Sequence, residues 1–292
     1  MIEPVDSLEI TVVVDNVTDS LSSTPKLVET EFAGAWRRGM KWLGGKCLCC
    51  AAHGLSCLIT VRTGGASHSL LFDTGPDEWV FERNVVRLSL DLGRVGAMML
   101  SHGHWDHAGA MPRALQLITL TNGGKPVPTY MHPDMFSSRA IVPPDGRLMP
   151  MEDIPSEQVL AGNGAQLVIT RDEQSVLSGS FYISGEIARV TPFERGLPGQ
   201  QLVVLVRGIA CSITCARCEC TKFRLFRFGD IVRVIAYQGG DSFAAFLFAA
   251  FCVEGKGSFP VQKHPNSERR LPLRISSPQG GGMPASCSAF DE

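Results

Sequence analysis

The sequence of 292 residues has no long hydrophobic run and little net charge, and both features narrow the functions that fit it. No stretch approaches the roughly 18–20 apolar residues that a membrane-spanning helix needs. The longest candidate, Phe243–Val253, is about half that length. The net charge of −2 argues against a chain built to cover nucleic acid or an anionic membrane. We therefore expect neither nucleic acid nor a membrane as a partner.

The first fifteen residues lack the basic charge of a secretory signal peptide, because Glu3, Asp6 and Glu9 stand where basic residues would be needed. We therefore expect a soluble, cytoplasmic protein. With 44% hydrophobic residues, the chain has enough apolar side chains for a sizeable core, which excludes wholesale disorder.

Histidine is nearly absent from the second half of the chain. Six of the seven histidines lie at or before His132, and only His264 follows. Eight of the ten cysteines form two groups, one within 47–57 and one within 211–220. Because the chain has no secretory signal, these cysteines are expected to be thiols or metal ligands rather than a disulfide framework.

Apolar and β-branched runs separated by turn residues predict an α/β layered domain. We expect strands at 7–15, 53–63, 69–73, 95–100, 129–132, 181–184 and 202–206, helices at 84–92 and 112–117, and a loop at 16–46. The run 95–100 is wholly apolar, which is typical of a buried strand.

One segment concentrates metal-binding side chains directly after that buried strand. Residues 101–109 read SHGHWDHAG, so three histidines and one aspartate lie within six residues. Imidazole nitrogen and carboxylate oxygen suit Zn²⁺, with Mn²⁺ or Fe²⁺ as alternatives. Two metal ions about 3.5–4 Å apart can hold a bridging hydroxide that is a nucleophile at neutral pH. The alternative, a histidine-rich surface loop, fits the strand-then-loop setting less well.

The HxHxDH pattern, preceded by LLFDTG at 70–75, resembles the metallo-β-lactamase superfamily. Within it, further blocks resemble the branch that includes ribofuranosyl-aminobenzene 5'-phosphate (methanopterin precursor) synthase-like proteins. These blocks are ITVVVDN at 10–16, HGLS at 53–56, LSHGHWDHAGAMP at 100–112, MHPDMF at 131–136 and SGEIARVTPFERG at 184–196. The resemblance implies an αββα sandwich with the metals at one edge.

The resemblance also implies a role for each residue of the motif. His102 and His104 would bind the first metal. Asp106 and His107 would bind the second, and Asp106 would also orient the nucleophilic water or accept its proton. Asp73 would lie below the site as an acceptor that holds the histidine loop through hydrogen bonds. The alternative for Asp73 is a turn residue before the following Thr-Gly pair.

Three further residues are possible pocket residues, namely His53, His132 and Glu186. A lone histidine at a strand end is often merely hydrogen-bonded, and a glutamate at a strand end is often exposed, so these alternatives stay open.

Downstream ligands that complete a site in this superfamily are missing from their expected places. After the strand expected at 202–206, the sequence reads IACSITC where the branch commonly has a histidine, and only His264 remains. A catalytic zinc usually has three protein ligands, so activity is in doubt. A thiolate from the Cys211–Cys220 cluster could supply the missing ligand. Alternatively, the change of composition near residue 208 indicates a misread frame.

The sequence thus predicts a metallo-β-lactamase-like domain at 1–208, a divergent segment at 209–260 and a disordered tail at 261–292. We expect a metal-dependent hydrolase that uses a metal-bound hydroxide on an ester, phosphoester, thioester or lactam-like bond of a small molecule. One or two Zn²⁺ ions are the expected cofactor. Two alternatives stay open: a degenerate member that lost its downstream ligands, and a transferase of the pterin-precursor synthase type. The sequence does not indicate an oligomeric state.

Overall fold

The computed structural model describes residues 5–18, 22–188, 198–206, 209–213, 232–234 and 247–249, all within the unit Met1–Val253. The cysteines of the Cys211–Cys220 cluster other than Cys211, most of 209–260 and the tail at 261–292 lie outside the described residues, so the predictions for them, like the boundary at 208, stay predictions. In this described part, no helix is long and apolar enough to cross a membrane.

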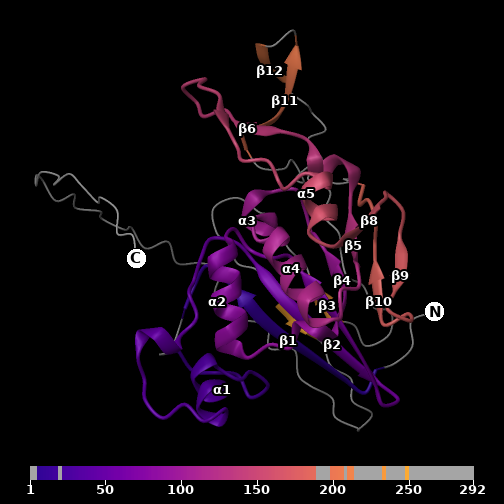
Figure 1. The fold of residues 1–292 in the computed structure, drawn as a ribbon. Helices are drawn as coiled ribbons and strands as arrows, with labels where there is room; N and C mark the ends of the chain where they lie inside the picture. The colour runs from indigo at the N-terminus through magenta and orange to yellow at the C-terminus, as the bar shows by residue number, and fades with distance from the viewer. Residues whose placement is uncertain are drawn as a thin grey trace, which may run out of the picture. The chain divides into compact units, whose positions relative to one another are not determined.

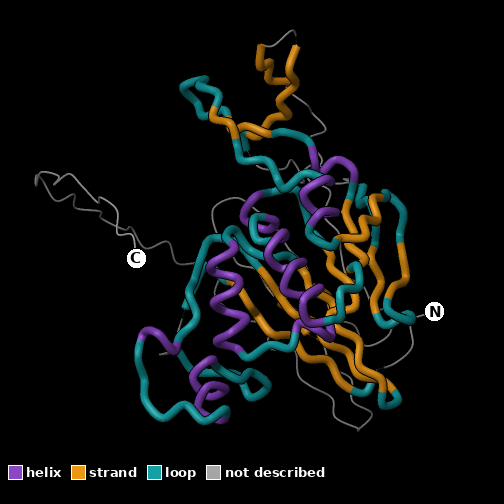
Figure 2. The backbone as a smooth tube through the Cα atoms, viewed as in Figure 1, coloured by secondary structure: helices purple, strands orange, loops and turns teal. Residues whose placement is uncertain are grey.

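A six-stranded mixed sheet carries the core (Figures 1 and 2). In spatial order its strands are β1 (Ser7–Val14), β2 (Ser56–Thr63), β3 (Ala66–Phe72), β4 (Val95–Met99), β5 (Val127–Met131) and β8 (Ala165–Ile169). The first three strands pair antiparallel, and β3, β4, β5 and β8 pair parallel. Ala97, Met98 and Met99 of β4 are buried, as the apolar run predicts.

Helices pack on the sheet and complete the hydrophobic core. α2 (Glu78–Leu88) and α4 (Met111–Thr121) contact each other and lie in front of the strands in Figure 1. α5 (Glu157–Gly162) packs against β8. Phe81, Leu115 and Leu160 from these helices are fully buried, and each such side chain contributes about 1.5–3 kcal/mol. This arrangement confirms the α/β class predicted from the sequence.

Shorter elements surround this core. A second sheet has the order β12-β11-β6-β7, and the pairs β9-β10 and β13-β14 each form a separate two-stranded sheet. The bounds are β6 (Arg139–Ile141), β7 (Met149–Pro150), β9 (Gln174–Val176), β10 (Phe181–Ile183), β11 (Gln200–Val206), β12 (Ile209–Ile213), β13 (Val232–Val234), β14 (Leu247–Ala249), α1 (Glu31–Arg37), α3 (Trp105–Ala108), η1 (Gly45–Cys47), η2 (Leu92–Arg94) and η3 (Pro133–Phe136).

Two predictions of local structure are wrong. The segment 16–46, predicted as a loop, contains α1, whose first turn is capped by the Thr30 hydroxyl accepting from the N–H of Ala33 at 3.2 Å. The helix predicted at 84–92 begins earlier and ends at Leu88, because Ser89 adopts a left-handed conformation with a φ of 54°. The predicted strands are present, with ends that differ by a few residues.

The parallel strands bring polar residues together at one edge of the central sheet. Asp73 follows β3, Ser101 comes two residues after β4, His132 follows β5 and Arg171 comes two residues after β8. Ligands in sheets of this kind bind beyond the carboxyl ends of the strands, so this edge is where a site is expected.

Candidate metal centre

Asp73 is the buried acceptor beneath the histidine motif. It has a left-handed φ of 55°, a conformation that aspartate tolerates better than most residues with a Cβ. Its Oδ1 accepts from the backbone N–H of Ser101, and its Oδ2 accepts from the Ser101 hydroxyl, both at 2.7 Å. The same Oδ2 accepts from Nδ1 of His107 at 2.7 Å. One carboxylate therefore contacts both the start and the end of the motif.

The Ser101 hydroxyl links Asp73 to His102 through two hydrogen bonds. The Ser101 hydroxyl donates its single proton to Asp73, so it accepts from Nδ1 of His102, which lies 3.0 Å away. A neutral imidazole has one protonated nitrogen, so this hydrogen bond leaves a lone pair on Nε2 of His102.

Gln200 acts on His104 in the corresponding way. Its Oε1 accepts from Nε2 of His104 at 3.0 Å, which leaves a lone pair on Nδ1 of that ring. Burial, working against the attraction of Asp106, lowers the pKa of His104 to about 4. His104 is therefore neutral at neutral pH.

The two lone pairs face each other and make the first donor pair. His102 Nε2 and His104 Nδ1 lie 3.1 Å apart. Two ligand atoms on one tetrahedral zinc ion are about 3.3 Å apart. With both rings neutral, the two unprotonated nitrogens repel at this separation unless a cation, either a proton or a metal ion, lies between them. The chemistry and orientation of this pair therefore fit a metal ion.

Asp106 and His107 of α3 make the second donor pair, with Oδ2 and Nε2 3.4 Å apart. Burial opposes charge on His107, but the negative charge of Asp73 and hydrogen bonds to both aspartates outweigh it and raise the pKa of His107 to about 10. Burial also opposes charge on Asp106, whereas the hydrogen bond and charge of His107 lower its pKa on balance. A metal on this pair would displace the proton of His107 Nε2.

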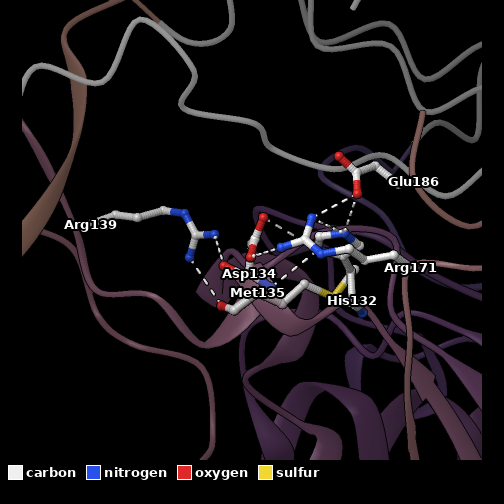
Figure 3. A network of polar contacts seen from close by, with 6 residues as sticks. All are labelled: His132, Asp134, Met135, Arg139, Arg171 and Glu186. Atoms are coloured by element: carbon white, nitrogen blue, oxygen red, sulfur yellow. Dashed lines mark hydrogen bonds and ion pairs between the residues drawn. The ribbon is translucent and has the colours of Figure 1, made fainter. Parts of the chain in front are cut away.

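The backbone between His102 and His104 is held from outside the motif. A Cβ on Gly103 would collide with the backbone of Met135, so only glycine fits there. The buried guanidinium of Arg139 donates from Nη1 to the carbonyl oxygens of Gly103 at 3.0 Å and Met135 at 3.1 Å. Figure 3 shows this side chain reaching Met135 and Asp134. Arg139 therefore ties the first donor pair to η3.

His132 and Glu186 lie together in a charged network (Figure 3). The fully buried His132 accepts at Nδ1 from the N–H of Asp134 at 3.1 Å, and its Nε2 lies 3.1 Å from Nη1 of Arg171 and 3.5 Å from Oε2 of Glu186. Arg171 donates from Nη1 to Glu186 at 2.7 Å and from Nη2 to Asp134 at 2.6 Å. These contacts fix both side chains, and their role as pocket residues stays a prediction.

His53 lies beside the second donor pair. Its Nε2 is 3.6 Å from Oδ2 of Asp106, and its ring is 6.0 Å from that of Trp105. Its side chain is 49% exposed, whereas that of Asp106 is 7% exposed. His53 therefore lies on the solvent side of the buried donors.

The described residues include no group of three or more His, Cys, Asp or Glu side chains gathered around one point as in a formed metal site. They contain instead two donor pairs. The first consists of two imidazole nitrogens, and the second of a carboxylate oxygen and an imidazole nitrogen. This donor set fits zinc, and each pair needs further ligands to complete a coordination shell.

Sequence reasoning missed three residues that hold the motif. Ser101 adjoins the histidines, so its position directly after a buried strand was an available signal. Gln200 and Arg139 carry no such signal, because β11 and β6 bring them to the motif only by long-range pairing.

Comparison with known proteins supports the resemblance read from the motifs. No protein-family model matches the chain. The chain is 28% identical over 135 residues to the 7,8-dihydropterin-6-methyl-4-(beta-D-ribofuranosyl)-aminobenzene-5'-phosphate synthase of Methanocaldococcus jannaschii. The match covers 46% of this chain and 44% of the synthase, so the chain aligns with less than half of that enzyme.

Solved structures with similarity include metallo-β-lactamase fold proteins. The metallo-beta-lactamase fold protein YhfI from Bacillus subtilis is 16% identical, with 65% of this chain and 57% of that chain covered and a TM-score of 0.34. MEM-A1, a subclass B3 metallo-beta-lactamase from a soil metagenome library, is also 16% identical, with 55% and 56% covered and a TM-score of 0.27.

Proposed function

We propose that the chain is a metal-dependent hydrolase with one or two zinc ions as cofactor. Its substrate would be a small molecule with an ester, phosphoester, thioester or lactam-like bond. The observation that carries the proposal is the first donor pair, in which His102 Nε2 and His104 Nδ1 face each other at 3.1 Å while the other nitrogen of each ring is hydrogen-bonded. Mn²⁺ and Fe²⁺ suit the same donors.

Each donor pair would bind one metal ion. His102 and His104 would hold one ion, and Asp106 and His107 the other. A bound divalent metal supplies a Lewis acid that polarises the scissile group and acidifies the attacking water. All four side chains are buried, and electrostatic interactions are stronger in such surroundings than in water.

The remaining polar contacts orient the donors. Asp73 prevents rotation of the His107 ring through its 2.7 Å hydrogen bond and keeps Ser101 aligned with His102. Asp106 has a lowered pKa, so its carboxylate is ionised at neutral pH and can orient the attacking water as a hydrogen-bond acceptor.

A second candidate is synthase chemistry of the pterin-precursor type. Its support is the 28% identity to the archaeal synthase, over a match that includes less than half of either chain. Both candidates use the same metal-binding motif, and they differ in whether water or a second substrate takes up the transferred group.

The test is an activity screen of the full chain after chelator treatment and readdition of Zn²⁺, Mn²⁺ or Fe²⁺. The substrates are a p-nitrophenyl ester, bis(p-nitrophenyl) phosphate, a thioester and a chromogenic cephalosporin. We expect metal to restore hydrolysis of at least one class. His104→Ala should lower the rate about 100-fold or more, as loss of a group that acts on the transition state does.

The control is His68→Ala, which changes a histidine of β3 outside the motif and should leave the rate unchanged. Metal binding without hydrolysis of any class would contradict the proposal and favour the degenerate alternative. A separate incubation with the substrates of the synthase that gives the relative's named product, without hydrolysis of any of the four classes, would favour the synthase.

A further inference from the structure

The second donor pair has two ligand side chains, and no third is gathered around them among the described residues, whereas a catalytic zinc usually has three protein ligands. Its buried side is already occupied, because Nδ1 of His107 is bonded to Asp73. His107 can therefore bind a metal only through Nε2, which faces Asp106, and a further ligand can reach this pair from the solvent side of Asp106. In the described part of the chain, the histidine at that position is His53.

His53 and His107 flank the same carboxylate oxygen. Nε2 of His53 is 3.6 Å from Asp106 Oδ2, and Nε2 of His107 is 3.4 Å from it. Neighbouring ligand atoms on one tetrahedral zinc ion are about 3.3 Å apart. The Nε2 atoms of both imidazoles therefore lie at nearly the distance from Asp106 Oδ2 that is expected of two ligand atoms on one metal ion.

The backbone beside His53 is held against the motif. Gly54 has a φ of +139°, and a Cβ there would collide with the carbonyl oxygen of Asp106. On either side, Ala52 donates its N–H to Asp15 at 2.9 Å, and Leu55 accepts from the N–H of Gly75 at 3.0 Å. The segment is thus anchored to the ends of β1 and β3, and the position of His53 beside Asp106 is built into the fold.

We propose that His53 is the third protein ligand of the metal ion held by Asp106 and His107, and that this ion is Zn²⁺ or another divalent transition metal. The inference rests on the proposed function. The side chain of His53 is half-exposed, and binding requires its ring to turn toward the other two donors, because no three such side chains of the described residues are already gathered around one point. With His53, the first half of the chain would provide one of the ligands that are missing from their expected places in the second half.

The test is zinc binding by the full chain, measured by titration against a chromophoric chelator, in wild type and in His53→Gln. We expect His53→Gln to weaken one bound equivalent at least about tenfold, since even the loss of an outer hydrogen-bond partner of a ligand costs 10–100-fold. The matched control is His68→Gln, which removes an imidazole from β3 and should bind zinc like wild type. Circular dichroism checks that each variant is folded.

A second readout counts histidine ligands directly. In the Co²⁺-substituted chain, each histidine ligand gives a strongly shifted, exchangeable N–H resonance in the proton NMR spectrum. His53→Gln should lose one such resonance, and His68→Gln should lose none. Unchanged zinc affinity together with an unchanged set of shifted resonances in His53→Gln would overturn the assignment.

Failure of this inference is distinguishable from failure of the proposed function. If wild type and His53→Gln bind zinc equally, and His104→Ala loses zinc, the metal centre stands without His53. If wild type binds no zinc at all, both proposals are overturned.

Discussion

Asp73 Oδ2 and His107 Nδ1 are joined by a hydrogen bond of 2.7 Å, which connects the end of β3 to the helix that carries the second donor pair. The backbone strengthens the connection, because the N–H of Thr74 donates to the carbonyl of His107 at 2.8 Å. The orientation of the His107 ring therefore depends on a residue 34 positions earlier in the chain.

Asp73→Asn tests this dependence. Asparagine keeps the size of the side chain and tolerates the left-handed backbone, but it has one acceptor oxygen where aspartate has two. We expect zinc affinity to fall about 10–100-fold with the fold retained, measured by chelator competition and circular dichroism. Asp91→Asn, at the exposed start of η2, is the control. Equal affinities for Asp73→Asn and wild type would contradict this role.

Gln200→Leu tests whether the side-chain amide sets the orientation of His104. Without the acceptor at 3.0 Å, Nε2 of His104 loses the partner that keeps its lone pair on Nδ1. We expect about tenfold weaker zinc binding at the first donor pair. Gln201→Leu is the matched control on the same strand, since the Oε1 of Gln201 is buried and has no hydrogen-bond partner among the described residues. A similar loss in both variants would indicate a general effect on β11.

Arg139→Met tests the anchoring of the histidine loop. The substitution leaves the carbonyls of Gly103 and Met135 without their charged donor, which we expect to cost about 3 kcal/mol of unfolding free energy. Arg139→Lys should recover only part of this stability, because an ammonium cannot reproduce the planar fork. Urea denaturation followed by circular dichroism measures both variants. A cost below about 0.5 kcal/mol for Arg139→Met, the size typical of a surface substitution, would contradict the anchoring role.

The pH dependence of stability tests the charge on His107. Its pKa in the folded chain, about 10, lies above the ordinary value of 6.5. The folded state therefore binds this proton more tightly than the unfolded state, so the stabilisation is complete below about pH 6.5 and is lost as the pH rises toward 10. We expect the free energy of unfolding, measured with a chelator present, to fall across this window more steeply in wild type than in His107→Gln. Parallel pH profiles for the two proteins would argue against a charged His107.

The sequence predicted those parts of the fold and site that are encoded locally. The buried strand β4 and the four donors after it form one continuous segment, so their proximity follows from the chain itself. The motif gave no indication of Gln200, which lies 96 positions from His104 and reaches it through the pairing of β11 with β6. Arg139 depends on the same pairing, opposite Leu202.

Helix α1 was missed for a different physical reason. Its seven residues make about two turns, so the apolar spacing of Phe32, Ala35 and Trp36 is too short a run to define a helical period, and Gly34 is the only residue of the helix that is buried. Its local signals are the Thr30 cap, Glu31 in the first turn and Arg37 in the last turn. These are short-range signals, which do not by themselves distinguish a two-turn helix from a loop.

The central claim is that the chain binds its metal through the histidines and aspartate of residues 102–107. X-ray absorption at the zinc edge of the zinc-loaded full chain tests it most directly. The account predicts a first shell of nitrogen and oxygen at about 2.0–2.1 Å, with the outer-shell scattering of imidazole. In the double variant His102→Ala, His104→Ala it predicts less bound zinc and a change in the imidazole scattering, because only the second donor pair is left to hold the metal. A shell dominated by sulfur at about 2.3 Å, unchanged in that variant, would place the zinc on cysteine thiolates and contradict the account.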